Sequence, residues 1–240
     1  MIKQSLLFCI SLLIIVGCAK DDNSNTTPSS IPGMGEAGGE LQVSAPFVLP
    51  EGVTLVSIEG IDDPVITTTF EESALKSSSR FGYRNNCRGS GGDWMALKMT
   101  FRKKNSNCKE IFLPAGCVFE SDDEESQNGI VMQDIKLIFE ELQETITAKI
   151  YLYCINKGRR GTSYRVNYNL KGITDCKIIL DVITALQNKR IDISDFTDED
   201  LDDYKEICSY LQDCVWKITN GNGLEDNDWN FIKRLRDRNR

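Results

Sequence analysis

Cysteine decides which chemistry this chain can perform, because the sequence contains nine cysteines and no histidine. Without imidazole, the chain lacks the general base of Ser-His-Asp and Cys-His hydrolases and the commonest nitrogen ligand for metals. A thiol can still form a disulfide, carry an acyl group or attack a carbonyl carbon. No Cys-x-x-Cys pair occurs and no cysteine spacing matches a zinc site, so we expect no bound metal and no cofactor.

The composition is typical of a folded protein. Of the 240 residues, 40% are hydrophobic and 27% are charged, as in ordinary globular chains. There are 28 basic and 36 acidic residues, which gives a formal net charge of −8. A nucleic-acid partner held by general phosphate neutralisation is therefore not expected.

The first residues have the pattern of an export signal. Lys3 precedes an apolar run at positions 6–16, which Gly17 and Cys18 close. This run is too short to cross a bilayer, which takes about 20 residues, so a signal peptide is the better interpretation. The stretch from Leu13 to Cys18 resembles a bacterial lipobox. The resemblance implies cleavage after Gly17 and a lipid such as palmitate on Cys18; the alternative is a plain signal peptide that happens to contain a cysteine there.

Residues 1–17 are thus predicted to be a lipoprotein signal peptide and residues 18–40 a lipidated flexible tether rich in Ser, Thr, Asn, Pro and Gly. Asp21 and Asp22 resemble an acidic tag that exports lipoproteins to the outer face of the outer membrane. We expect a protein attached to the outer membrane by its lipid, at the cell surface. Residues 41–240 are predicted to form one β-rich domain with C-terminal helices, in which 41–85 could be a small separate β-region.

Hydrophobic patterning predicts strands first and helices last. Short apolar or alternating runs broken by Gly, Pro and Asn predict strands at 41–43, 53–58, 65–70, 95–101, 111–112, 118–119, 130–132, 135–139 and 145–154. Helical spacing predicts helices at 175–188, from Thr197 as the N-cap to about 220, and at 226–235. The expected fold class is α+β, an antiparallel β-sandwich or barrel-like β-region followed by a helical subdomain. A parallel nucleotide-binding sheet is not expected because strands and helices do not alternate.

The folded part retains an odd number of cysteines. Cys9 leaves with the signal peptide and Cys18 is lipidated, so seven remain: Cys87, Cys108, Cys117, Cys154, Cys176, Cys208 and Cys214. In an oxidising exterior, six of them could form three disulfides in any of fifteen pairings. The seventh is either a buried thiol that packs as a small hydrophobe or a thiol used in other chemistry.

Two short motifs indicate which of the seven cysteines is the unpaired one. An aromatic-Cys-aliphatic motif is centred on Cys154, and an apolar-Gln-x-x-apolar-Trp motif runs from Leu211 through Gln212 to Trp216. Together, and in this order, they resemble the thioester domains of bacterial surface adhesins over roughly residues 90–235. The two motif residues are 58 positions apart, a short separation that implies a trimmed helical insertion. Cys214 departs from the pattern, because the family usually has alanine there.

The resemblance implies an internal thioester between Cys154 and Gln212, shielded from water by Tyr153, Val215 and Trp216. An amine of a partner would attack the Gln212 carbonyl carbon and release the Cys154 thiol, leaving an amide between the two proteins. On this interpretation the chain is an adhesin or attachment module and not an enzyme, its partner is a host or cell-surface protein or glycan, and the disulfide candidates are Cys87, Cys108, Cys117, Cys176, Cys208 and Cys214.

Other interpretations of the same residues stay open. Gln212 could be an exposed helix residue and Cys154 half of a disulfide, in a non-covalent binding or structural lipoprotein of the cell envelope. A glycan-degrading enzyme with paired carboxylates is a further alternative, although no acidic pair occurs in a recognisable motif. A second glutamine, Gln133, precedes Cys154 and lacks the tryptophan, so we expect it on the surface of a strand.

Overall fold

We describe residues 31–62, 87–91, 94–104 and 107–238 of a computed structural model. The predicted signal peptide, Cys18, most of the tether and the strand expected at 65–70 lie outside these residues. Within the described ranges, no helix is long and apolar enough to cross a membrane.

The largest sheet is built around two long, alternating strands. In β3 (Ala96–Lys103) and β8 (Thr145–Tyr151), every second side chain is buried in the main core and the residues between are exposed or half-buried, except Ala96 and Tyr151, which are buried in another cluster. Both strands pair antiparallel, and β1 (Val53–Gly60) pairs antiparallel with the other edge of β3. The short strand β2 (Cys87–Gly89) completes the order β1-β3-β8-β2. It runs parallel to β8, so the predicted all-antiparallel pairing is wrong at this edge.

Two further sheets complete the β-region. One has the order β10-β5-β6-β9 and the other is the pair β4-β7; the strands are β4 (Glu110–Leu113), β5 (Cys117–Ser121), β6 (Gly129–Ile130), β7 (Ile135–Ile138), β9 (Tyr153–Cys154) and β10 (Tyr168–Ile173). The inward side chains of β4 and β7 join those of β3 and β8 in one hydrophobic core. The sheets are arranged like a sandwich, which confirms the expected α+β class.

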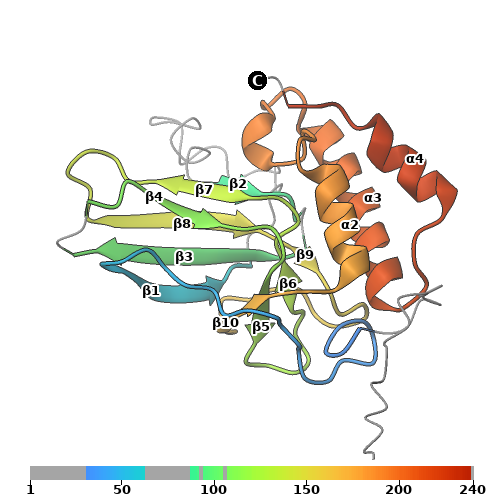
Figure 1. Ribbon diagram of the computed structural model, residues 1–240, viewed down its shortest axis with the longest axis horizontal. Coiled ribbons are helices and arrows are strands. Elements are labelled where there is room, and N and C mark those ends of the chain that lie inside the picture. Colours follow the sequence, from blue (N-terminus) through green and yellow to red (C-terminus); the bar gives the residue numbers. More distant parts are fainter. Residues whose placement is uncertain (1–30, 63–86, 92–93, 105–106, 239–240) are drawn as a thin grey trace, which may run out of the picture.

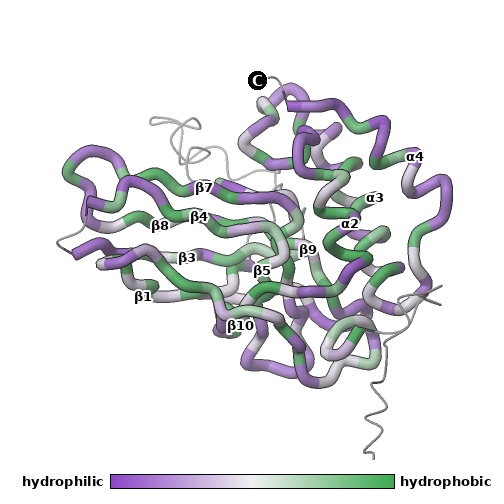
Figure 2. The backbone as a smooth tube through the Cα atoms, in the orientation of Figure 1, coloured by the Kyte–Doolittle hydropathy of each residue, from purple (hydrophilic) through white to green (hydrophobic). Residues whose placement is uncertain are grey.

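Helices follow the strands and lie together at one end of the β-region (Figure 1). They are α2 (Lys177–Leu186), the short 3-10 helix η1 (Ile193–Asp195), α3 (Leu201–Thr219) and α4 (Asp226–Arg234). Hydrophobic residues recur along α2 and α3 (Figure 2). Their buried faces form a second hydrophobic core with Tyr153 and Ile155 from the end of β9. Helix α3 therefore packs directly against β9.

Helix α3 begins one turn later than the sequence predicted. Its N-cap is Asp200, not Thr197, whose backbone N–H and hydroxyl both donate to the Asp200 carboxylate. Burial opposes ionisation of Asp200, but the hydrogen bonds from Arg190 and Thr197 outweigh it and lower its pKa to about 2. Thr197 thus lies in the turn that precedes the helix, because the carboxylate three residues later bonds it there.

Gln133 lies inside the protein, where a strand-surface position was predicted. Its side chain is 3% exposed, and its Nε2 donates to the carbonyls of Leu186, Gln187 and Lys189. These carbonyls end α2, and the last carbonyls of a helix have no partner within the helix. Gln133 therefore fastens the end of α2 to the β-region.

Asp228 fastens α4 to α3. Lys217 donates to both carboxylate oxygens at 2.8 and 2.9 Å, and Tyr210 and the backbone N–H of Glu225 donate to them as well. Burial disfavours the charged form, but these hydrogen bonds outweigh burial and lower the pKa of Asp228. The ionised carboxylate is thus the form that holds the two helices together.

We predict that Asp228→Asn lowers the free energy of unfolding by about 1–3 kcal/mol at pH 7, because Lys217 loses a charged, buried partner. A carboxyl whose pKa is lowered by folding stabilises the native state above its unfolded pKa, and this contribution disappears as the pH falls through the folded pKa. The difference between variant and wild type should therefore shrink as the pH falls below 3.8, the ordinary value for aspartate.

Urea unfolding across that pH range measures both quantities. Asp226→Asn, an exposed acid in the same helical turn, serves as the control and should change stability by less than about 0.5 kcal/mol. A pH-independent loss in Asp228→Asn would contradict this assignment.

Candidate functional site

The two residues of the predicted thioester are in direct contact in the interior. The backbone N–H of Cys154 donates to Oε1 of Gln212, and Nε2 of Gln212 donates to the backbone carbonyl of Cys154, both at 2.8 Å. Cys154 is 0% exposed and Gln212 is 1% exposed. The interpretation of Gln212 as an exposed helix residue is therefore wrong.

The contact has a clear structural cause. Strand β9 pairs with β6 on one edge only, with Gly129 opposite Cys154. The other edge faces α3, and a helix offers no free backbone groups to a buried strand. A glutamine carboxamide carries one acceptor and a donor group side by side, as a neighbouring strand would. Gln212 thus takes the place of a strand partner for Cys154.

The side chain of Cys154 lies in the core between the sheets. Burial raises the pKa of its thiol well above the usual cysteine range, so the group is a neutral thiol at physiological pH. Tyr168 shares this core, and a charge on Cys154 would raise the pKa of the Tyr168 hydroxyl, which burial already raises. That hydroxyl is buried and has no hydrogen-bond partner among the described residues.

Trp216 separates this part of the core from the surface. It is half-buried and packs against the cluster that contains Cys154. The ring of Trp94, which is 50% exposed, meets it edge to face with ring centres 5.4 Å apart. The ammonium group of Lys157 lies 6.0 Å from the Trp216 ring centre. Trp216 is therefore flanked by a second indole ring and a cationic side chain where it packs on the cluster that contains Cys154.

The other two predicted shielding residues occupy the neighbouring core. Tyr153 and Val215 are buried in the cluster beneath the helices, and the Tyr153 hydroxyl points toward the sulfur of Cys208 at 4.0 Å. Successive side chains of a strand point to opposite faces, so Tyr153 points away from the Cys154 side chain. Of the three predicted residues, Trp216 is the one packed in the same cluster as that side chain.

The cysteines predicted to form disulfides are dispersed through the fold. Cys117, Cys176 and Cys214 are free thiols in the structure, as is Cys154, so the disulfides expected of the first three are not formed. Cys117 lies in the core between the sheets and Cys176 at the start of α2. Desolvation and the nearby Asp134 raise the pKa of Cys117 to about 12.

Two of the remaining disulfide candidates share a cluster, and the third lies elsewhere. Cys87 and Cys208 belong to one small buried cluster with Tyr204. Cys108, at the start of β4, donates from its sulfur to the carbonyl of Glu110. Cys214, at the position where the adhesin family usually has alanine, lies on α3. Desolvation and the nearby Asp228 raise its pKa to about 12.

Within the ranges that the structure describes, no group of three or more His, Cys, Asp or Glu side chains could hold a metal ion. Comparisons of the chain with protein-family models, with curated proteins and with solved structures found no match. Function is therefore argued below from the geometry of the Cys154–Gln212 contact.

We predict that Gln212→Ala lowers the free energy of unfolding by about 2–4 kcal/mol, because the buried N–H and carbonyl of Cys154 lose their partners. Asp213→Ala, at the exposed neighbouring position on α3, is the matched control and should stay within about 0.5 kcal/mol of wild type. Chemical unfolding of the full chain measures both. Equal stability of the two variants would mean that the paired hydrogen bonds are not formed in solution.

Proposed function

We propose that this protein is a lipid-anchored surface attachment module that binds its partner covalently through a thioester between Cys154 and Gln212. The observation that carries the proposal is the buried, two-point contact between these residues, which lie 58 positions apart in the sequence. The resemblance to adhesin thioester domains requires this pair to meet, and composition gives no other reason to expect it.

The geometry favours attack of the sulfur on the amide carbon. The Gln212 carboxamide lies in line with the backbone N–H and carbonyl of Cys154, as a neighbouring strand would. The Cβ of a strand residue projects out of that plane. The sulfur of Cys154 therefore starts above or below the amide plane, the side from which a nucleophile reaches a carbonyl carbon. Holding two groups in such a position is worth effective molarities of about 10⁵ M or more.

The reaction balances without an external oxidant or cofactor. A bond forms between the Cys154 sulfur and Cδ of Gln212, the carbon–nitrogen bond of the carboxamide breaks, and the thiol proton leaves with ammonia. A partner amine then attacks Cδ, forms an amide and returns the proton to sulfur.

Water must be kept from the thioester until the partner arrives. Cys154 and Gln212 are almost completely buried, and Trp216, with Trp94 against its ring, packs on the cluster that contains Cys154. Apolar rings exclude water and so slow hydrolysis, which would discharge the bond. The half-exposed Trp94 is where an incoming side chain would first make contact.

The tether meets the body of the protein next to this pair. The backbone N–H of Gly35 donates to the carbonyl of Ile155, and Nδ2 of Asn156 donates to the carbonyls of Gly33 and Gly35. A partner joined to Gln212 would thus be held a few residues from the chain segment that leads to the lipid on Cys18. This arrangement suits a protein that attaches a cell to another surface.

A non-covalent function is the alternative, and one observation favours it. The carboxamide of Gln212 already satisfies a buried strand edge at both of its ends, while burial keeps the Cys154 thiol protonated. In a structural or binding lipoprotein, these contacts alone would explain why both residues are present, without a covalent bond between their side chains.

Intact mass separates the two proposals. A thioester makes the mature chain lighter by one ammonia than its sequence requires, and methylamine should add to it and expose one new thiol. Cys154→Ala should abolish both effects. Cys117→Ala is the matched control, because Cys117 is equally buried in the same core, and it should keep them. A wild-type chain that has the full sequence mass, apart from disulfide hydrogens, and ignores methylamine would rule out the covalent function.

The lipid anchor is tested separately. Cells that express the full chain should incorporate labelled palmitate into it, and Cys18→Ala should lose the label, since the acyl chains are expected on that sulfur. Exposure at the surface is read by protease treatment of intact cells. Label that persists in Cys18→Ala, or protection of the domain from protease, would contradict the respective part of the proposal.

A further inference from the structure

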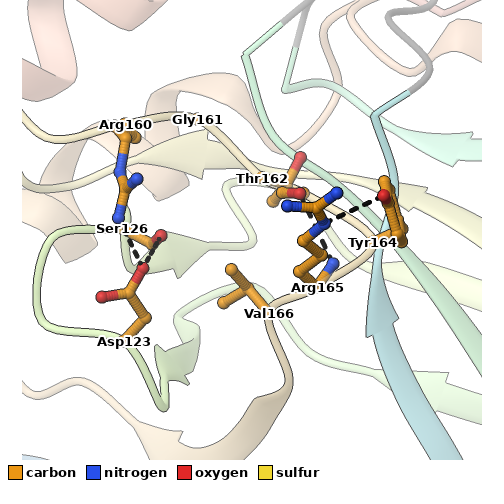
Figure 3. A pocket seen from close by; sticks show the side chains of 9 residues that line it. Asp123, Ser126, Arg160, Gly161, Thr162, Tyr164, Arg165 and Val166 are labelled. Atoms are coloured by element: carbon orange, nitrogen blue, oxygen red, sulfur yellow. Dashed lines mark hydrogen bonds and ion pairs between the residues drawn. The ribbon is translucent and has the colours of Figure 1, made fainter.

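The loop that follows Cys154 forms one side of an open polar pocket of about 650 Å³. Figure 3 shows two groups of side chains facing each other across it. Arg160, Asp123 and Ser126 lie on one side, Arg165 and Tyr164 on the other, and Val166 lies between them. All but Asp123 and Ser126 come from the segment that connects β9 with β10.

On one side of the pocket, a single arginine is paired with two carboxylates. Arg160 forms ion pairs with Asp123 at 3.0 Å and Glu125 at 2.9 Å, and Ser126 donates to Asp123. Hydrogen bonds from Ser126 and from the Glu125 backbone lower the pKa of Asp123, so this acid is ionised at neutral pH. These contacts hold the turn at 122–126 against the loop and neutralise Arg160, and one of the two negative charges is left over.

The other side carries a cation that is held in place. Nε of Arg165 donates to the Tyr164 hydroxyl at 2.9 Å, and the guanidinium lies 5.2 Å from the centre of the Tyr164 ring. No carboxylate of the described residues pairs with Arg165. Its terminal nitrogen atoms thus remain for a ligand, and a guanidinium matches the two oxygens of a carboxylate with two parallel hydrogen bonds.

The pocket lies beside Trp94. The backbone N–H of Thr162 donates to the carbonyl of Trp94 at 3.4 Å. Gly161 approaches the same carbonyl so closely that a Cβ on it would lie 2.8 Å away. Because the Trp94 ring packs on Trp216, the pocket is connected through Trp94 to the cluster that contains Cys154.

We propose that this pocket is the docking site for the partner, and that it binds an acidic peptide segment by placing a carboxylate on Arg165. The inference rests on the proposed function in one respect, namely that the same segment presents a lysine to Gln212. A protein segment is favoured over a glycan because it supplies both groups, the carboxylate for the arginine and the amine for the thioester.

Short peptides provide the test. In the first measurement, the full chain reacts with peptides of the series acetyl-Glu-(Gly)n-Lys-amide, which have one to four glycines. A second series has Gln in place of Glu. The mass of the intact protein shows how fast each adduct forms. The wild type should react with the best Glu peptide about two- to five-fold faster than with its Gln counterpart, the gain expected of an exposed ion pair. Arg165→Gln should lose this preference, whereas Arg102→Gln, an exposed arginine on β3, should keep it. Methylamine, which needs no docking, should react equally with all three proteins.

A second measurement does not depend on the thioester. The full chain is titrated with the same Glu and Gln peptides, whose lysine is now acetylated so that it cannot react. NMR follows the resonances of the residues that line the pocket. The Glu peptides should bind more tightly to the wild type and to Arg102→Gln, but not to Arg165→Gln. Failure of methylamine to react overturns the proposed function alone. An equal response to Glu and Gln peptides in the wild type, or a preference that survives Arg165→Gln, overturns the docking site.

Discussion

The pair of hydrogen bonds between the Gln212 carboxamide and the backbone of Cys154 is the constraint on which the arrangement of the two halves depends. A buried strand edge must be satisfied, and β9 meets a helix where it would otherwise meet a strand. The carboxamide fixes both the depth of α3 and its rotation, since no other side chain of the helix bonds to Cys154. With α3 fixed in this way, Trp216 is brought one turn later to the rim of the core between the sheets.

Two more polar side chains join parts of the helical layer. Gln133 binds the end of α2 to the β-region, and Asp228 binds α4 to α3. Each is buried and bonds several partners at once, which offsets the cost of burying a polar group; the Oε1 of Gln133 alone has no partner among the described residues. The helical layer is thus attached to the strands at defined points as well as by its apolar faces.

Local pattern predicted the elements that have a strong period of their own. The alternation in β3 and β8 and the helical spacing in α2, α3 and α4 were sufficient to predict strands and helices there. The three residues of β2 were missed because their strand character comes from parallel pairing with β8, and β10 was missed because a register shift at Gly172 interrupts its alternation. The N-cap at Asp200 depends on its bond to Arg190, which no local rule contains.

The candidate site also contains residues that the sequence predicted and residues that it did not. Motif order predicted that Cys154 and Gln212 belong together, and the structure brings them into contact, but which neighbours share the sulfur's side depends on strand direction and packing. Tyr153 and Val215 accordingly face the other core. Trp94 was not predicted, because its role arises only from the contact with Trp216. The pocket at Arg165 was missed for a similar reason, since Asp123 and Ser126 are brought to it from another part of the chain.

The segment at 33–36 has a mechanical consequence. It bonds to Ile155 and Asn156 beyond Cys154 and to Asn220 at the end of the helix that carries Gln212. In the proposed attachment function, tension between the lipid-held N-terminus and a load fixed at Gln212 would pass through these few bonds and bypass most of the sheets. Mechanical force on an attached cell would then act on the few hydrogen bonds of residues 33–36, and the β-sandwich would carry little of it.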